Sequence, residues 1–210
     1  DCSQCSVTIP TPTRVPTSPP TLSCSSSGNF LNTAYDGNGG RLTSGTDSHW
    51  GVAMTSSNVT GQPPPNLNYT AATVYTGTFL QAPVGPAGWI THNAGGGHVG
   101  SVDVFYRYQF NLDGAVDPRN LALNMRFNAD NAVYEVWVNG VAQGIRSGFG
   151  SGDPYQYIGF DLANPASGTM QGAWQTGLNT IIVHVKSSPG TEAFLAYITT
   201  TAICLPKLTL

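Results

Sequence analysis

The residues best suited to covalent chemistry in this chain are four cysteines, Cys2, Cys5, Cys24 and Cys204. Four thiols can form disulfides in three pairings. Two bridges within the chain are one arrangement, although a Cys2–Cys5 bridge closes a very small loop. In the alternative, Cys2 and Cys5 bond to Cys24 and Cys204 of the next subunit. Either arrangement needs an oxidising compartment, so the cysteines predict an extracellular or cell-surface protein.

Cys2 and Cys5 lie in a segment, residues 1–24, whose composition differs from that of the rest of the chain. It holds five of the fifteen prolines and is otherwise rich in serine and threonine. Proline fixes φ and favours extended geometry, so we expect a stretched arm here. A flexible linker is the alternative interpretation. If the arm adds as a strand to a neighbouring subunit, we expect its apolar contacts to come from three residues, Val7, Ile9 and Val15.

Aromatic and amide side chains offer a second kind of chemistry, the binding of sugars. Sugar rings stack on aromatic faces, and hydroxyls bond to amide and guanidinium groups. In the alternative interpretation the tryptophans are core residues, and Asn131 belongs to a turn. The candidate glycan contacts are Trp89, Trp137, Trp174, Tyr155, Asn131 and Arg126.

The acidic residues give little support to catalysis. Glu135 and Glu192 are the only glutamates, and a glycosidase needs two opposed carboxylates. No Gly-x-Ser-x-Gly motif occurs, so no nucleophile elbow is written in the chain. We therefore expect a protein that is not an enzyme.

Metal ligands are equally sparse. The four histidines show no His-x-His or His-Glu-x-x-His spacing, although His92 and His98 flank three glycines at 95–97. Calcium prefers oxygen donors from loops, and Asp113 and Asp117 lie in such a loop. We expect no cofactor other than a structural calcium ion at these two aspartates.

The overall composition limits the classes of partner that this chain can bind. Only 9% of the 210 residues are charged, against about 25% in a typical globular protein. The net charge is −3 with eight Lys and Arg, which offers no basic face for nucleic acid. No apolar run approaches the length of about 18 residues that a membrane-spanning helix needs. Subunits that bury much of their surface against one another fit a charge-poor composition.

Period-two alternation predicts the elements that must position these residues. Residues 102–112 and 121–127 alternate apolar and polar side chains, as strands with one buried face do. A third strand follows at 133–138, with Tyr134, Val136 and Val138 expected on the core side and Asn139-Gly140 expected to form a hairpin turn. Further strands are expected over 73–80, 88–91, 155–162, 180–185 and 193–203, with a loop over 163–178.

About eight or nine short strands with no helical periodicity predict an all-β fold, a jelly-roll β-sandwich of antiparallel strands. We expect the sandwich to span residues 25–204. The extended arm at 1–24 precedes it, and a short tail at 205–210 follows it.

Short motifs along the chain support a resemblance to a known family. They are Asp47–Trp50, Gly88–Ile90, Tyr106–Leu112, Asp117–Pro118, Phe127–Asn131, Val138–Gly140, Phe160–Leu162 and Gly177–Ile181. Over roughly residues 42–204 the chain resembles galactose-binding-like jelly-roll domains of bacterial secreted and surface proteins, including those with a PEP-CTERM sorting tail. The resemblance implies either carbohydrate binding or a structural role. Residues 1–24 have no counterpart in that family, and residues 205–210 are not a hydrophobic anchor.

Two functions compete on these observations. The cysteine-containing arm and the charge-poor composition favour a structural subunit of an extracellular filament, assembled head-to-tail from copies of this chain. The family resemblance and the aromatic residues favour a secreted carbohydrate-binding or adhesion module, with glycans as partners. We prefer the filament subunit, because an arm passed from one subunit to the next makes an open, head-to-tail contact.

Overall fold

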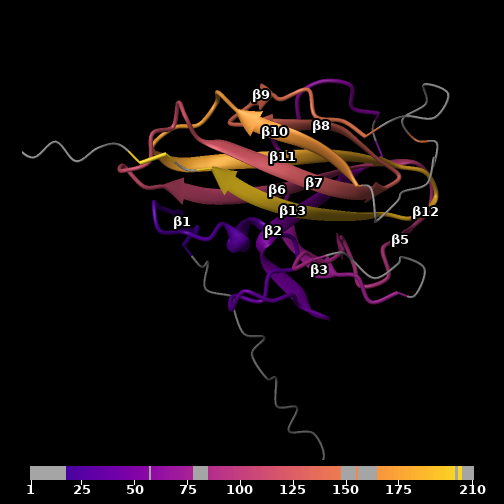
Figure 1. The fold of residues 1–210 in the computed structure, drawn as a ribbon. Helices are drawn as coiled ribbons and strands as arrows, with labels where there is room; N and C mark the ends of the chain where they lie inside the picture. The colour runs from indigo at the N-terminus through magenta and orange to yellow at the C-terminus, as the bar shows by residue number, and fades with distance from the viewer. Residues whose placement is uncertain are drawn as a thin grey trace, which may run out of the picture.

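A computed structural model describes residues 18–56, 58–77, 85–147, 155, 165–201 and 203–204. Over these residues the chain is all-β, a sandwich of the jelly-roll type, as the alternation predicts (Figure 1). The elements are β1 (Thr21–Leu22), the 3₁₀ helix η1 (Asn29–Leu31), β2 (Thr46–Thr55), β3 (Thr70–Val74), β4 (Ile90–Thr91), β5 (Gly97–His98), β6 (Val102–Leu112), β7 (Ala122–Asp130), β8 (Ala132–Val138), β9 (Val141–Ala142), β10 (Ala166–Gln171), β11 (Gly177–Ser187), β12 (Gly190–Thr191) and β13 (Ala193–Thr201).

Several predictions concern residues outside this description. They are the two arm cysteines, Cys2 and Cys5, the apolar arm residues Val7, Ile9 and Val15, most of the strand expected over 155–162, and the tail over 205–210. The described residues contain no helix long and apolar enough to cross a membrane.

One curled sheet makes both layers of the sandwich. Its strand order is β10-β7-β13-β4-β3-β2-β6-β11-β8-β9, with β1 paired to β6. β10, β7 and β13 form one layer, which lies over β6 and β11 in Figure 1. The short strands β3 and β4 carry the sheet from one layer to the other, and β5 and β12 pair separately.

The core lies between the two layers, and β6 shows how the sequence builds it. Alternate side chains of this strand point inward, and all five of them are buried, as expected. β7 supplies the opposite wall with Leu123, Met125 and Phe127, also buried. Removing a large apolar side chain from water stabilises the fold by about 1.5–3 kcal/mol. The inward set on β6 is Val104, Tyr106, Tyr108, Phe110 and Leu112.

The prediction for β8 is wrong at one residue. Val136 and Val138 are in the core as expected, but Tyr134 is only partly buried, and Val133 takes the core position instead. The cause is a register shift against β11, where His184 pairs with Glu135 but Val185 pairs with Val133. Such a β-bulge inserts one residue and reverses the faces on one side of it.

Two element predictions also need correction. The span 163–178 was expected to be a loop, but β10 occupies Ala166–Gln171 and pairs with β7. Its sequence, ASGTMQ, has little β-branched or aromatic character, so pairing with β7 and not local propensity makes it a strand. The strand expected over 73–80 begins earlier, because β3 spans Thr70–Val74.

Candidate assembly junction

The last residues of the predicted arm belong to the sandwich. β1 runs parallel to β6, with Thr21 opposite Asn111 and Leu22 opposite Leu112. The backbone N–H of Asn111 donates to the carbonyl of Pro20 at 2.8 Å, and that of Asp113 donates to the carbonyl of Leu22 at 2.9 Å. Leu22 is fully buried. The arm is therefore anchored by strand addition to its own domain at residues 20–22.

β2 leaves room for this addition by ending its pairing with β6 early. The last paired residues are Trp50 of β2 and Tyr108 of β6. Between Thr46 and Gly51 the register of β2 is irregular, and here the Asp47 carboxylate accepts the backbone N–H groups of Ala34, His49 and Trp50 at 2.7, 2.8 and 3.1 Å. Asp47 is fully buried, so it fixes the point at which β2 diverges from β6.

A cleft of about 310 Å³ lies at this divergence, between the base of the arm and the sheet. The Arg107 guanidinium lies 4.1 Å from the centre of the Tyr69 ring. Burial raises the pKa of Tyr69 to about 12 although Arg107 opposes the shift, so the phenol stays neutral. Its hydroxyl has no hydrogen-bond partner among the described residues. The lining residues are Ser18, Pro19, Pro20, Ser48, His49, Trp50, Gly51, Tyr69, Thr70, Ala71, Arg107 and Gln109.

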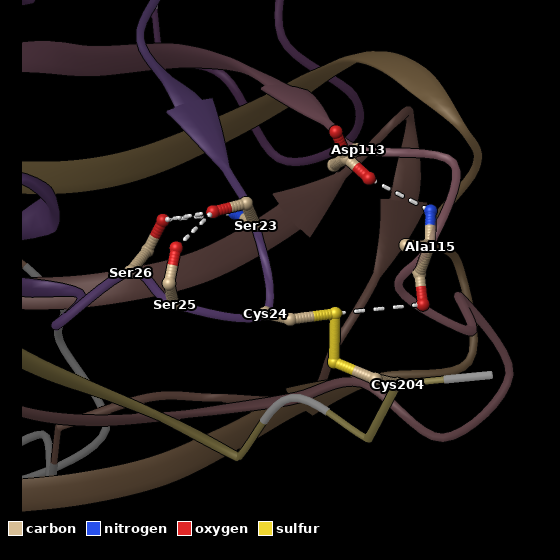
Figure 2. The surroundings of a disulfide bond; sticks show 7 residues. All are labelled: Ser23, Cys24, Ser25, Ser26, Asp113, Ala115 and Cys204. Atoms are coloured by element: carbon tan, nitrogen blue, oxygen red, sulfur yellow. Dashed lines mark hydrogen bonds between the residues drawn. A yellow bond between two sulfur atoms is a disulfide. The ribbon is translucent and has the colours of Figure 1, made fainter. Parts of the chain in front are cut away.

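A disulfide joins Cys24 to Cys204 within the chain, across 180 residues of sequence (Figure 2). Cys204 also forms a β-bridge with Val116, and the Cys24 sulfur lies 3.7 Å from the carbonyl of Ala115. The start and the end of the sandwich are thus held together at one site. This bond corrects the arrangement in which Cys24 and Cys204 bond to Cys2 and Cys5 of the next subunit, because both sulfurs are already used.

The predicted glycan contacts do not form one site. The exposed fractions of Trp89, Trp137 and Trp174 are 4%, 4% and 8%, which corrects the expectation that their faces are open to solvent. Each packs within the fold, because an indole ring buries more apolar surface than any other side chain. Trp89 contacts a small apolar cluster, Trp174 lies 5.7 Å from Phe110, and Trp137 stacks on His184.

The polar members of that set are also separated. The Asn131 side chain is buried and accepts hydrogen bonds from Ser187 and Ser188, so it is structural. Tyr155 donates to Asp103 at 2.7 Å. Arg126 alone is exposed, and it borders a hollow of about 170 Å³ together with Tyr197.

The two aspartates expected to bind calcium have other partners. Asp113 accepts the backbone N–H of Ala115 at 2.8 Å, as Figure 2 shows. Asp117 accepts two bonds from the Arg119 guanidinium at 3.0 Å, and these hydrogen bonds lower the pKa of Asp117. Among the described residues no group of three or more His, Cys, Asp and Glu side chains is placed to hold a metal ion. The calcium site stays a prediction.

The two glutamates lie in separate buried clusters. Glu135 pairs with Arg146 at 3.1 Å. Glu192 pairs with His92 at 2.7 Å and accepts a hydrogen bond from the hydroxyl of Tyr106, an inward-facing residue of β6. Asp130 is close enough for its pKa to rise to about 7, through burial and then through the charge of Glu192. The glutamates therefore do not face each other across a cleft.

Sequence reasoning missed the cleft completely. Tyr69 precedes β3 and belongs to no motif, whereas Arg107 lies in β6 and within the motif Tyr106–Leu112, which gave no sign of a cleft. Two motifs, Asp47–Trp50 and Tyr106–Leu112, supply part of the lining, but their spacing along the chain does not predict that they meet. No sequence signal marks a cleft that forms because one strand stops pairing.

Comparisons with protein-family models, with curated proteins and with solved structures give no match for this chain. The resemblance to galactose-binding-like domains therefore stays a prediction.

Proposed function

We propose that this chain is a non-enzymatic structural subunit of an extracellular filament or appendage, assembled head-to-tail through its N-terminal arm. The observation that supports it is a donor and an acceptor for strand addition on one chain. The donor is the arm, whose base at 20–22 already pairs as a strand. The acceptor is β10, which ends the sheet and, among the described residues, pairs as a strand with β7 alone.

β10 has the side chains of an unprotected edge strand, although the backbone N–H of Gln171 donates to the Gln143 side chain at 2.9 Å. Ser167, Thr169 and Gln171 are exposed, and the strand carries no proline and no charge. Natural proteins usually protect an edge with lysine, proline or a bulge, because an uncovered edge pairs with other chains. A donor and an acceptor on different parts of one chain make a heterologous contact, which extends into a filament unless it closes into a ring.

The cysteines fit the same proposal. Cys24 and Cys204 staple the sandwich within one subunit. Cys2 and Cys5 then remain to bond either to each other or to another subunit, and the proposal takes the second pairing.

The test is assembly of the full chain, followed by electron microscopy and by gels with and without reductant. We expect polymers from the natural chain and monomers after deletion of residues 1–17, a deletion that keeps β1 and Cys24. Polymers that persist after the deletion would contradict the role of the arm. Circular dichroism checks that the shortened chain is folded.

A second pair of variants tests the acceptor. Ser167→Lys with Gln171→Lys places charge on the exposed side chains of β10, and we expect assembly to stop. Asn38→Lys adds a charge to an exposed turn and serves as the control. Equal assembly of all three chains would show that β10 is not the acceptor.

The cleft at the arm base favours the alternative function, a carbohydrate-binding or adhesion module. It brings an aromatic ring, a guanidinium and an amide together in Tyr69, Arg107 and Gln109, as sugar sites do. Because Trp50 lines the cleft, sugar binding should change tryptophan fluorescence. No change with a panel of glycans, and none on a glycan array, would exclude this alternative.

A further inference from the structure

A charged cluster is buried on the outer face of the sheet, away from the junction. Asp103 of β6 lies directly opposite Lys186 of β11, and His184 lies two residues before Lys186 on the same face. The side chains of Asp103 and His184 are fully buried, and that of Lys186 is 1% exposed. Lysine is almost never buried this deeply unless it is paired, and here its partner is Asp103.

Asp103 is held as a carboxylate by several donors. His184 Nε2 lies 2.5 Å away and Lys186 Nζ 2.8 Å away, both on Oδ1, and the Tyr155 hydroxyl lies 2.7 Å from Oδ2. Burial raises the pKa of Asp103, but these hydrogen bonds outweigh it and lower the pKa below its usual value. A carboxylate only accepts, so the His184 proton is on Nε2. Asp103 is therefore a fixed acceptor beside the lysine.

A third group reaches the same lysine from the loop after β2. Lys186 Nζ lies 2.8 Å from the side-chain oxygen of Asn58. The next residue fixes this loop, because the backbone N–H of Val59 donates to Asp103 at 3.3 Å. The rings of Tyr134 and Tyr155 cover the amine, with their centres 4.8 and 4.6 Å from Nζ. An amine, a carboxamide and a carboxylate thus meet in a site walled by aromatic rings.

From this geometry we infer that Lys186 and Asn58 become joined by an intramolecular amide bond, with Asp103 carrying the proton. Asp103 takes a proton from the Lys186 ammonium, and the free amine attacks Cγ of Asn58. The new N–C bond forms, and the protonated carboxyl gives its proton to the amide nitrogen of Asn58. The C–NH₃⁺ bond then breaks, and the departing ammonia takes the second proton from the lysine nitrogen. One ammonium plus one carboxamide yields one secondary amide and one ammonium ion, so no oxidant or cofactor is consumed.

General chemistry explains why such a site reacts. A lysine becomes nucleophilic when it is desolvated beside a base. Holding the reacting groups in contact removes most of the entropic barrier between them. The inference does not depend on filament assembly, because all three groups belong to one chain.

Mass spectrometry of the purified full chain tests the bond. We expect an intact mass lower than that of the disulfide-bonded sequence by one ammonia. Trypsin does not cleave after an acylated lysine, so cleavage after Lys186 should be lost. Asn58 and Asp103 share one tryptic peptide, 42–107, and chymotrypsin separates them. Fragmentation should then place the link between Lys186 and Asn58.

Each other result overturns the inference. An unlinked Lys186 does so, and so does a glycan on Asn58. A mass lower by one water, with a link to Asp103, would show that Lys186 bonds to the carboxyl of Asp103 and not to the carboxamide of Asn58. Loss of ammonia without a link would be a succinimide within one peptide.

Matched variants keep the test independent of folding. Asn58 is exposed and lies in a loop, so Asn58→Ala should fold yet lack the bond. Asn68 is an exposed residue of the same connection between β2 and β3, and Asn68→Ala should retain the bond. On a reducing denaturing gel the natural chain and Asn68→Ala should migrate faster than Asn58→Ala and Lys186→Arg, because the bond closes a loop of about 128 residues. Equal migration of all four would contradict the bond.

Discussion

The two faces of β6 reach burial by opposite means. The inner face presents Tyr108, Phe110 and Leu112 to the facing layer, in a core of apolar side chains. The outer face buries the charged Asp103 against His184 and Lys186, beside Phe105. The inner face gains stability from every apolar atom that it removes from water. The outer face gains only while every charge keeps its partner, because an unpaired buried charge is costly.

The largest expected effect is on the inner face. Phe110→Ala removes a ring that packs 6.3 Å from Tyr108 and 5.7 Å from Trp174. We expect a loss of about 3–5 kcal/mol, with little dependence on pH. Urea unfolding at two pH values measures it. A loss that disappears at one pH would show that the inner face is not a simple apolar core.

The outer face should respond to whether its charges are changed singly or together. Without Asp103 the amide bond does not form, so Asp103→Leu leaves the Lys186 ammonium buried without a carboxylate, and we expect a loss of about 3 kcal/mol. Adding Lys186→Met removes the unpaired charge and should restore most of that stability. Urea unfolding of the single and double variants gives the coupling. If the double variant is as unstable as the single one, charge pairing does not govern this face.

The free energy of unfolding should depend on pH through Asp130 of β7, which lies near Glu192 and the inward-facing Tyr106. The pKa of Asp130 is about 7 in the fold and about 3.9 in an unfolded chain, so between these values the folded state holds an extra proton. Stability from this group is therefore present below about pH 4 and is lost as pH rises toward 7. Asp130→Asn should flatten the fall. Thermal unfolding from pH 4 to 7 measures it, and an unchanged slope would assign the effect to another group.

The smallest effect is expected where the outer face of β6 borders the cleft at the arm base. Gln109 is partly exposed, and its amide donates to Thr180 at 3.3 Å. Gln109→Ala should cost about 0.5 kcal/mol or less. A loss as large as that of Asp103→Leu would mean that the whole outer face acts as one unit.

Much of the fold was predictable because period two decides it. The alternation of β6 predicts its bounds and its inward set, and Asn139-Gly140 marks the turn between β8 and β9. The prediction for Tyr134 was wrong because its face depends on a β-bulge. Pairing with β11 sets that bulge, and no local sequence pattern reveals it. The prediction of a loop at β10 was wrong for a related reason, because this segment becomes a strand by pairing with β7.

The candidate sites were much less predictable. Cys24 and Cys204 could be paired only as one option among several, because distance along the chain does not decide proximity. The burial of Trp89 and Trp137 depends on which segments cover them. The alternation of a strand shows which side chains share a face, but not whether that face is covered. The contact of Asn58 with Lys186 joins residues that are 128 positions apart.

The Cys24–Cys204 bond also decides how the molecule carries tension. Force applied at the two ends of the sandwich passes through the sulfur–sulfur bond and bypasses the strands between them. The 180-residue separation corresponds to about 600 Å of extended chain, which stays hidden from a steady pull. If Lys186 is joined to Asn58, a reductant that cleaves the disulfide releases only the segments outside that link, about 170 Å of extended chain, whereas an unlinked chain such as Asn58→Ala releases the whole length. The two covalent bonds therefore set, in succession, how far the domain extends under load.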